Sequence, residues 1–234
     1  MSVPPPDGPA PRIPTSTSML RELMGWQEIP LLATRLPALL GAPRGARSVL
    51  VLPGFGASDA STWVLRRYLA WLGHDVHGWG LGANDGDVPR LLARVLALVD
   101  ELAVSRGGSL DLVGWSLGGY IAREAARDRP DLVRRVVTLG SPVVGGPKYT
   151  AVGRRYVAAG YDLDAIEAAV EARGAVPIRV PITAIFSRWD GIVAWEACID
   201  RRSPDVEHVE VKATHLGLGF SAEVLALVAR RLAA

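Results

Sequence analysis

Residues 110–119 read Leu-Asp-Leu-Val-Gly-Trp-Ser-Leu-Gly-Gly and bring three local signals together. An apolar strand candidate at residues 109–114 runs into the pattern G-x-S-x-G, and a helical pattern follows over residues 117–127. A short apolar run without alternation is typical of a strand that is buried on both faces. The glycines around Ser116 predict a sharp turn in which the serine takes strained backbone angles. The stretch therefore predicts a buried strand, a tight turn and a helix, with Ser116 at the turn.

The same alternation of apolar strands and amphipathic helices extends to both sides. Further strand candidates lie at residues 48–53, 74–79, 132–139, 182–186 and 206–211, and further helix candidates lie at 62–72, 88–104 and 221–232. Strands separated by helices at this spacing predict right-handed crossovers and a mostly parallel sheet with helices on both faces. The predicted fold class is α/β.

Residues 143–180 interrupt this alternation. The segment opens with the turn-rich sequence VVGGPKYT and contains an amphipathic helix candidate at residues 165–173. Asp164 and Glu167 are spaced as a capping box at the start of that helix. An insertion of this kind over an α/β sheet predicts a small cap.

The N-terminal part lies outside the repeating pattern. Residues 1–18 are rich in proline and predict a disordered leader, without the charged start and apolar stretch of a secretory signal. Residues 19–47 predict a helical arm with one or two short helices, and residues 48–234 the main domain. No apolar run approaches the ~20 residues that a membrane span requires, so we expect no transmembrane segment and a cytoplasmic location.

Composition and charge exclude several classes of function. The 234 residues are 49% hydrophobic and 21% charged, which is ordinary for a globular chain. The formal net charge is only +2, and the basic residues are spread along the chain, so nucleic acid is not expected as a partner. Cys198 is the single cysteine, which excludes an internal disulfide and a cysteine-based metal site. Phosphate-loop and H-E-x-x-H motifs are missing from the sequence, so we expect no cofactor and no metal.

Ser116 can act as a nucleophile only if a base removes its proton. His215 lies in the loop THLGLG after the last strand candidate, at the same end of the sheet as Ser116. His74 and His77 are three residues apart in one strand candidate and point to opposite faces. His208 lies within a strand candidate, where a core or solvated histidine is expected. His215 is therefore the predicted base.

An acid must hold that histidine, and Asp190 occupies the matching place in the sequence. It follows the strand ITAIF in the loop SRWDGIV, at the carboxyl end of the sheet where the loops of Ser116 and His215 also lie. The competing acids Glu196, Asp200 and Asp205 lie farther from a strand end. The chain order serine, aspartate, histidine differs from the orders of chymotrypsin and subtilisin.

Two backbone N–H groups are candidates to stabilise negative charge on a substrate oxygen. The N–H of Leu117 follows the nucleophile directly, and the N–H of Phe55 comes from the loop PGFG after the first strand. Gly54 and Gly56 let that loop approach a substrate closely. These positions predict an oxyanion hole made of Phe55 and Leu117.

Together the segments LPGFGAS, LVGWSLGG, VVTLGSP, IFSRWDGIV and THLGLG resemble the α/β-hydrolase superfamily. Within it they are similar to bacterial serine esterases and lipases of the triacylglycerol lipase and GPI inositol-deacylase group, from about Ser48 to the C-terminus. The resemblance implies an eight-stranded, mostly parallel sheet, a cap between Leu139 and Ile182, a Ser-Asp-His triad and ester hydrolysis without a cofactor. Many relatives carry His-Gly before the oxyanion residue, whereas this chain has Pro53-Gly54.

These observations predict a serine hydrolase that cleaves a small-molecule or lipid-like carboxylic ester through an acyl-enzyme on Ser116. Gly54 and Trp115 are predicted to contact substrate. Apolar side chains near the nucleophile and in the insertion form either an acyl pocket or plain core: Phe55, Trp115, Val143, Val144, Tyr149 and Tyr156. A thioesterase, amidase or acyltransferase would use the same triad, and a binding module without catalysis would keep the same scaffold. The sequence leaves the acyl chain length, the alcohol half and the oligomeric state open.

Overall fold

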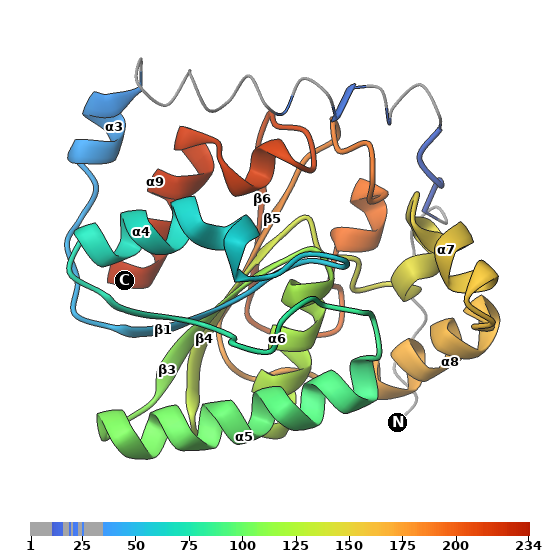
Figure 1. The fold of residues 1–234 in the computed structure, drawn as a ribbon, viewed down its shortest axis with the longest axis horizontal. Coiled ribbons are helices and arrows are strands. Elements are labelled where there is room, and N and C mark those ends of the chain that lie inside the picture. Colours follow the sequence, from blue (N-terminus) through green and yellow to red (C-terminus); the bar gives the residue numbers. More distant parts are fainter. Residues whose placement is uncertain (1–10, 16–18, 20, 23–24, 26–34) are drawn as a thin grey trace.

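The computed structural model describes residues 11–15, 19, 21–22, 25 and 35–234. Within these residues, six strands form one parallel sheet in the order β2-β1-β3-β4-β5-β6 (Figure 1). The strands are β1 (Ser48–Leu52), β2 (Asp75–Gly78), β3 (Leu110–Trp115), β4 (Val133–Leu139), β5 (Ile182–Phe186) and β6 (Val206–Glu210). The helices are α3 (Leu36–Leu40), α4 (Trp63–Trp71), α5 (Val88–Arg106), α6 (Leu117–Asp128), α7 (Gly153–Ala158), α8 (Leu163–Gly174) and α9 (Ala222–Ala233), and short 3-10 helices are η2 (Asp59–Thr62), η3 (Gly146–Tyr149), η4 (Trp195–Cys198) and η5 (Gly217–Gly219). The predicted α/β class is confirmed, and the predicted strands and helices of the main domain agree with these bounds within one or two residues.

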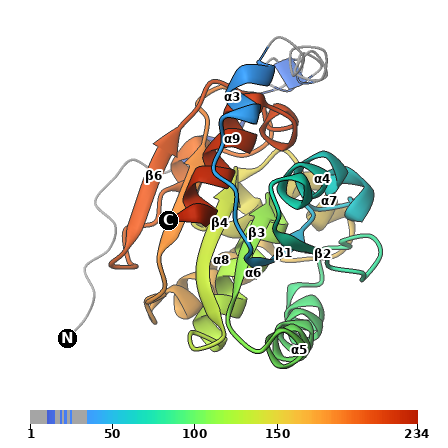
Figure 2. The ribbon, with the colours of Figure 1, turned by 90° about the vertical axis from the view of Figure 1, so that its left-hand side faces the viewer.

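Helices cover both faces of the sheet, which explains the continuous apolar runs of the strands. On β1, Val49 and Val51 pack against the face covered by α3, α4 and α9, whereas Leu50 and Leu52 pack against the face covered by α5 and α6. Figure 2 shows α3 and α9 on one side of the sheet and α5 on the other. Because successive side chains of a strand point to opposite faces, a strand between two helical layers has to be apolar at every position.

The number of strands differs from the expectation. The family resemblance implies eight strands, and the described residues form six. Ahead of β1, residues 35–47 form α3 and an irregular connection instead of a further strand. This segment contains Pro37, Gly41, Pro43 and Gly45, which are residue types that strands disfavour. The predicted leader at residues 1–18 lies largely outside the described residues, as does most of the arm between residues 20 and 34.

The cap at residues 143–180 contains η3, α7 and α8, of which α7 was not predicted. The predicted capping box of Asp164 and Glu167 is wrong, because α8 begins earlier and its N-cap is Asp162. The Asp162 carboxylate accepts hydrogen bonds from the backbone N–H groups of Asp164 (2.9 Å) and Ala165 (3.2 Å). Asp164 and Glu167 instead bind the Lys148 ammonium, each at 2.6 Å, and tie α8 to η3.

The crossing of β3 and α6 leaves no room for side chains at its glycines. A Cβ atom on Gly114 would lie 2.4 Å from the Cα atom of Gly119, and one on Gly118 would lie 2.5 Å from the carbonyl oxygen of Leu52. These neighbours are backbone atoms of the sheet and the helix, so they cannot swing aside as a flexible side chain would. The start of α6 can therefore lie this close to β3 and to the end of β1 only with glycine at both positions.

We expect Gly114→Ala to destabilise the protein by about 1–3 kcal/mol, because overpacking a close-packed crossing forces backbone shifts. For a chain of this size each kcal/mol lowers Tm by about 2–4 °C. Gly108→Ala is the matched control, since a Cβ atom there would meet no heavy atom within 4 Å. Thermal unfolding followed by circular dichroism measures both variants. Equal midpoints for the two variants would contradict the crowded crossing.

Candidate active site

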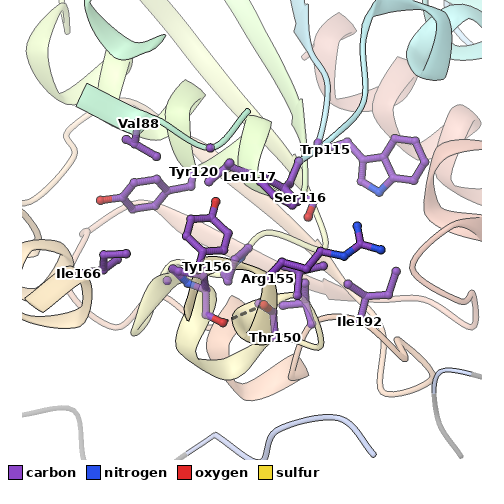
Figure 3. A pocket seen from close by; sticks show the side chains of 18 of the residues that line it. Val88, Trp115, Ser116, Leu117, Tyr120, Thr150, Arg155, Tyr156, Ile166 and Ile192 are labelled. Atoms are coloured by element: carbon purple, nitrogen blue, oxygen red, sulfur yellow. Dashed lines mark hydrogen bonds between the residues drawn. The ribbon is translucent and has the colours of Figure 1, made fainter. Parts of the chain in front are cut away.

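Ser116 has the backbone strain that its sequence context predicts. It lies between β3 and α6 with φ of 54°, and it is the one non-glycine residue with positive φ among those the structure describes. Its N–H donates to the carbonyl of Leu139 on β4 (2.8 Å), and its carbonyl accepts from the N–H of Gly119 (2.9 Å). A non-glycine residue persists in such a conformation only where its surroundings enforce it. Figure 3 shows the Ser116 side chain at the wall of a cavity.

Asp190 and His215 form a buried pair at the carboxyl end of the sheet. The Nδ1 atom of His215 lies 2.7 Å from Oδ2 of Asp190, and both side chains are at most 5% exposed. The other carboxylate oxygen, Oδ1, accepts from the N–H groups of Ile192 (2.8 Å) and Val193 (2.7 Å), which fixes the carboxylate on its own loop. Gly140 packs against the pair, because a Cβ atom there would lie 3.0 Å from both Asp190 Oδ2 and His215 Nδ1. Since Nδ1 donates to the carboxylate, Nε2 is left as the acceptor nitrogen of neutral His215.

The pKa of His215 is higher than the ordinary value of 6.5. Burial by itself lowers this pKa, since it disfavours the charged imidazolium. The negative charge of Asp190, its hydrogen bond to the ring and the charge of Glu22 together outweigh the effect of burial. Imidazolium is therefore stabilised at this position.

Ser116 and His215 both line a cavity of about 760 Å³ that runs beneath the cap. Its wall is mostly apolar and includes residues of α5, α6, α7 and α8 (Figure 3). Within the part of the chain that the structure describes, the Ser116 hydroxyl makes no hydrogen bond to a protein group. Such contacts are often long in a free enzyme and tighten when substrate binds. The arrangement places the Ser116 hydroxyl and the Asp190-paired ring of His215 on one mostly apolar wall.

The loop of Gly54 and Phe55 runs directly beside Ser116. A Cβ atom on Gly54 would lie 3.1 Å from Cβ of Ser116, and Phe55 and Leu117 both line the cavity. Among the described residues, the backbone N–H groups of Phe55 and Leu117 have no protein acceptor. Two free N–H groups beside a nucleophile are what an oxyanion requires.

Asn84 holds this loop and was missed in the sequence. Asn84 is fully buried, and its side-chain amide donates to the carbonyl of Pro53 (2.9 Å). Its backbone carbonyl accepts from the N–H of Gly56 (2.7 Å), and its N–H donates to the carbonyl of Ala57 (2.8 Å). A single asparagine in the loop segment GANDGD carries no local signal for this role, because the contact joins residues 31 positions apart.

Glu22 is a second residue near the site that sequence reasoning missed. It comes from the N-terminal arm, is 6% exposed and accepts hydrogen bonds from the loops of both Asp190 and His215. In sequence it is one of 24 acidic residues and lies in a segment without a catalytic motif.

The other three histidines, and Asp200 among the competing acids, have structural partners elsewhere. His208 Nε2 accepts from the N–H of Asp200 (3.0 Å), and the Asp200 carboxylate pairs with buried Arg123 (2.5 Å). His77 lies 3.0 Å from Asp75, and His74 is buried against Gly45. None of these groups lines the cavity of Ser116.

The predicted apolar pocket residues divide into two groups. Phe55, Trp115 and Tyr156 line the cavity, as does Gly54. Three others do not line it: Val143 and Val144, whose N–H groups bind the carbonyl of Ala197, and Tyr149, whose hydroxyl donates to Glu167 (2.8 Å). Trp115 also donates from Nε1 to the carbonyl of His215 (3.2 Å), so it supports the histidine loop as well as the cavity wall.

The described residues form neither a metal-binding cluster nor a helix suited to crossing a membrane. They contain no group of three or more histidine, cysteine, aspartate or glutamate side chains placed to hold a metal ion. None of their helices is both long enough and apolar enough to cross a bilayer.

Known proteins resemble this chain in sequence over a short region and in fold over most of its length. A region of 79 residues is 35% identical to a pimeloyl-[acyl-carrier protein] methyl ester esterase from Aliivibrio salmonicida (strain LFI1238), and it covers 33% of this chain and 26% of that protein. Among solved structures, mouse alpha/beta hydrolase domain-containing protein 10 matches with a TM-score of 0.60 and 22% identity, over 80% of this chain and 89% of the other. A structure from a study of the metagenome-derived lipolytic enzymes LipS and LipT matches with a TM-score of 0.64 and 18% identity, over 82% and 94%. At these sequence identities the structural matches show the fold alone.

The family comparison covers most of the sequence. Residues 49–229 match the family described as "Alpha/beta hydrolase family", and this range contains the sheet except for Ser48, the first residue of β1, together with Ser116, Asp190 and His215. The parallel sheet, the strained serine at the turn from β3 to α6 and the family match thus agree, and the chain belongs to the alpha/beta hydrolase family.

Proposed function

We propose that this protein is a serine hydrolase of carboxylic esters, with Ser116 as nucleophile, His215 as base and Asp190 as the acid that orients it. The observation that carries the proposal is the buried Asp190–His215 pair, with Ser116 on the wall of the same apolar cavity. Membership of the alpha/beta hydrolase family supports hydrolysis as the class of reaction. The matched region of the methyl ester esterase supports an ester as the substrate.

The first half of the reaction forms an acyl-enzyme. Ser116 Oγ attacks the ester carbonyl while Nε2 of His215 takes its proton, and Asp190 stabilises the imidazolium that results. The N–H groups of Phe55 and Leu117 donate to the oxyanion of the tetrahedral intermediate. Collapse breaks the bond to the alcohol oxygen, and His215 returns the proton to the leaving alcohol.

The second half releases the acid. Water attacks the acyl carbon while His215 again accepts a proton, and the second tetrahedral intermediate collapses to free the Ser116 hydroxyl. No other group is required for the proton balance, because each proton that His215 accepts is returned within the same half-reaction.

The cavity indicates the acyl group of the ester. Apolar side chains of the cap and of α6, such as Ile166, Val170 and Tyr120, line the cavity. Figure 3 shows Ile166 and Tyr120 on the part of the wall that lies away from Ser116. The charged side chains Glu124 and Arg173 also border it but bind each other. An apolar acyl chain fits this wall, since it gives up no hydrogen bond on entry.

We expect wild type to hydrolyse p-nitrophenyl esters and Ser116→Ala to lose this activity by several orders of magnitude, because the variant cannot form an acyl-enzyme. A series from acetyl to palmitoyl, assayed under identical conditions, measures the rate and the preferred chain length. A fluorophosphonate probe labels wild type and not the variant. Folded wild type that neither hydrolyses an ester nor takes up the probe would contradict the assignment of Ser116.

We expect His215→Ala to lower kcat by several orders of magnitude and His208→Ala to change it little, because His208 only accepts a backbone hydrogen bond. Steady-state kinetics on the preferred ester measure both variants, and His208→Ala serves as the matched control. The reverse ranking would show that the base has been assigned to the wrong histidine.

We expect Ile166→Trp to shift the preference towards short acyl chains, because the larger side chain fills the part of the cavity away from Ser116. Each methylene that loses its place costs ~0.8 kcal/mol, so two of them reduce kcat/KM for a long ester about tenfold. Ala168→Trp is the control, because Ala168 is exposed on the same helix and does not line the cavity. An unchanged chain-length profile in Ile166→Trp would contradict this acyl site.

A further inference from the structure

The Glu22 carboxylate bridges two loops of the candidate active site. Its Oε1 atom accepts from the N–H of Gly191 (2.7 Å) and from the N–H of His215 (3.0 Å). Its Oε2 atom accepts from the N–H of Leu216 (2.8 Å). Gly191 follows Asp190 directly, so one side chain binds both the loop of the acid and the loop of the base.

This contact is buried and closely packed. Glu22 is 6% exposed and His215 is 4% exposed, so water does not replace these hydrogen bonds if the carboxylate is lost. Three residues further along the arm, Gly25 packs on the same histidine loop, since a Cβ atom there would lie 2.6 Å from Oγ1 of Thr214. Met19, on the other side of Glu22, lines the cavity of Ser116. The arm therefore lies against the site at three positions.

In addition to its hydrogen bonds, the negative charge of Glu22 affects His215. Two carboxylates face this histidine, Asp190 at Nδ1 of the ring and Glu22 at the backbone N–H, and both raise the pKa of the imidazole. Arg155 of the cap lines the same cavity, and among the described residues it has no carboxylate partner. Glu22 thus adds a second negative charge beside His215, at its backbone N–H.

We propose that Glu22 is a positioning residue of the hydrolase: it holds the Asp190 and His215 loops against each other, and its charge stabilises the imidazolium that forms when His215 takes the Ser116 proton. The proposal rests on the proposed function. It assigns a role in the reaction to the N-terminal arm. The family match begins at residue 49, after the arm, and the catalytic motifs do not include Glu22.

The test uses Glu22→Gln in the full-length chain. The amide keeps the size of the side chain, but it is neutral, and its NH₂ group meets a backbone N–H that requires an acceptor. We expect kcat to fall about 10- to 100-fold on the preferred p-nitrophenyl ester, because small displacements of the base are costly, while KM changes little. The acid limb of the kcat/KM pH profile moves to lower pH, because less negative charge favours neutral His215.

Two further variants separate charge from packing. Glu22→Asp keeps the charge but is shorter, so we expect the acid limb to stay near that of wild type and kcat to lie between wild type and Glu22→Gln. Glu101→Gln is the matched control, because it removes an exposed carboxylate on α5 and should leave both quantities unchanged. Thermal unfolding of each variant identifies a loss of kcat that comes from unfolding.

The titration of His215 by NMR gives a readout that does not depend on ester turnover. The histidine ring signals of wild type and Glu22→Gln are followed against pH, with His215 assigned by its loss in His215→Ala. A lower pKa of His215 in Glu22→Gln supports the proposal even if the natural substrate is not an ester. A fall in kcat without any shift in the acid limb or in this titration would reduce Glu22 to a structural anchor and overturn the proposal, as would wild-type kinetics in Glu22→Gln.

Discussion

The structure depends on the close approach of β3 and α6, which forces the chain to turn within the few residues around Ser116. Gly114 makes that approach possible, and Gly118 lets α6 lie equally close to the end of β1, because backbone atoms occupy the space where their side chains would be. The strain at Ser116, with φ of 54°, is the local consequence. It is maintained by the packing of the central strand against the helix, and it places the hydroxyl at the carboxyl end of the sheet, where the other loops of a parallel sheet also meet.

A second constraint is electrostatic. His215 is buried, which by itself disfavours its charged form, yet the general base of the proposed reaction must carry a proton. Asp190 and Glu22 compensate from two sides, and each carboxylate is in turn held by backbone N–H groups. The site therefore keeps its charges in a fixed geometry without solvent, a condition under which electrostatic stabilisation of a transition state is strong.

The strands and the three candidate site residues could be predicted because short stretches of sequence indicate them. The apolar runs of the strands reveal burial on both faces, and the positions of Ser116, Asp190 and His215 follow from loops at the ends of such strands. Glu22 and Asn84 had no such signal, because their roles arise from contacts with residues 169 and 31 positions away. The start of α8 was misplaced because several acidic residues compete for the N-cap, and only the backbone conformation at Asp162 decides between them.

The parts predicted from sequence and the parts that were missed have different roles in the molecule. The sheet and its loops carry the residues of the proposed reaction, and regular secondary structure places them. The cap and the arm determine what enters the cavity, since Ile166, Tyr156 and Met19 all lie on its wall. The helices of the cap are short, and Met19 of the arm reaches the cavity wall across a long distance in sequence, so local sequence signals for these positions are weak. On the proposed function, this is where related chains with the same triad would differ in substrate, and by the proposal for Glu22 such a segment also acts on the base itself.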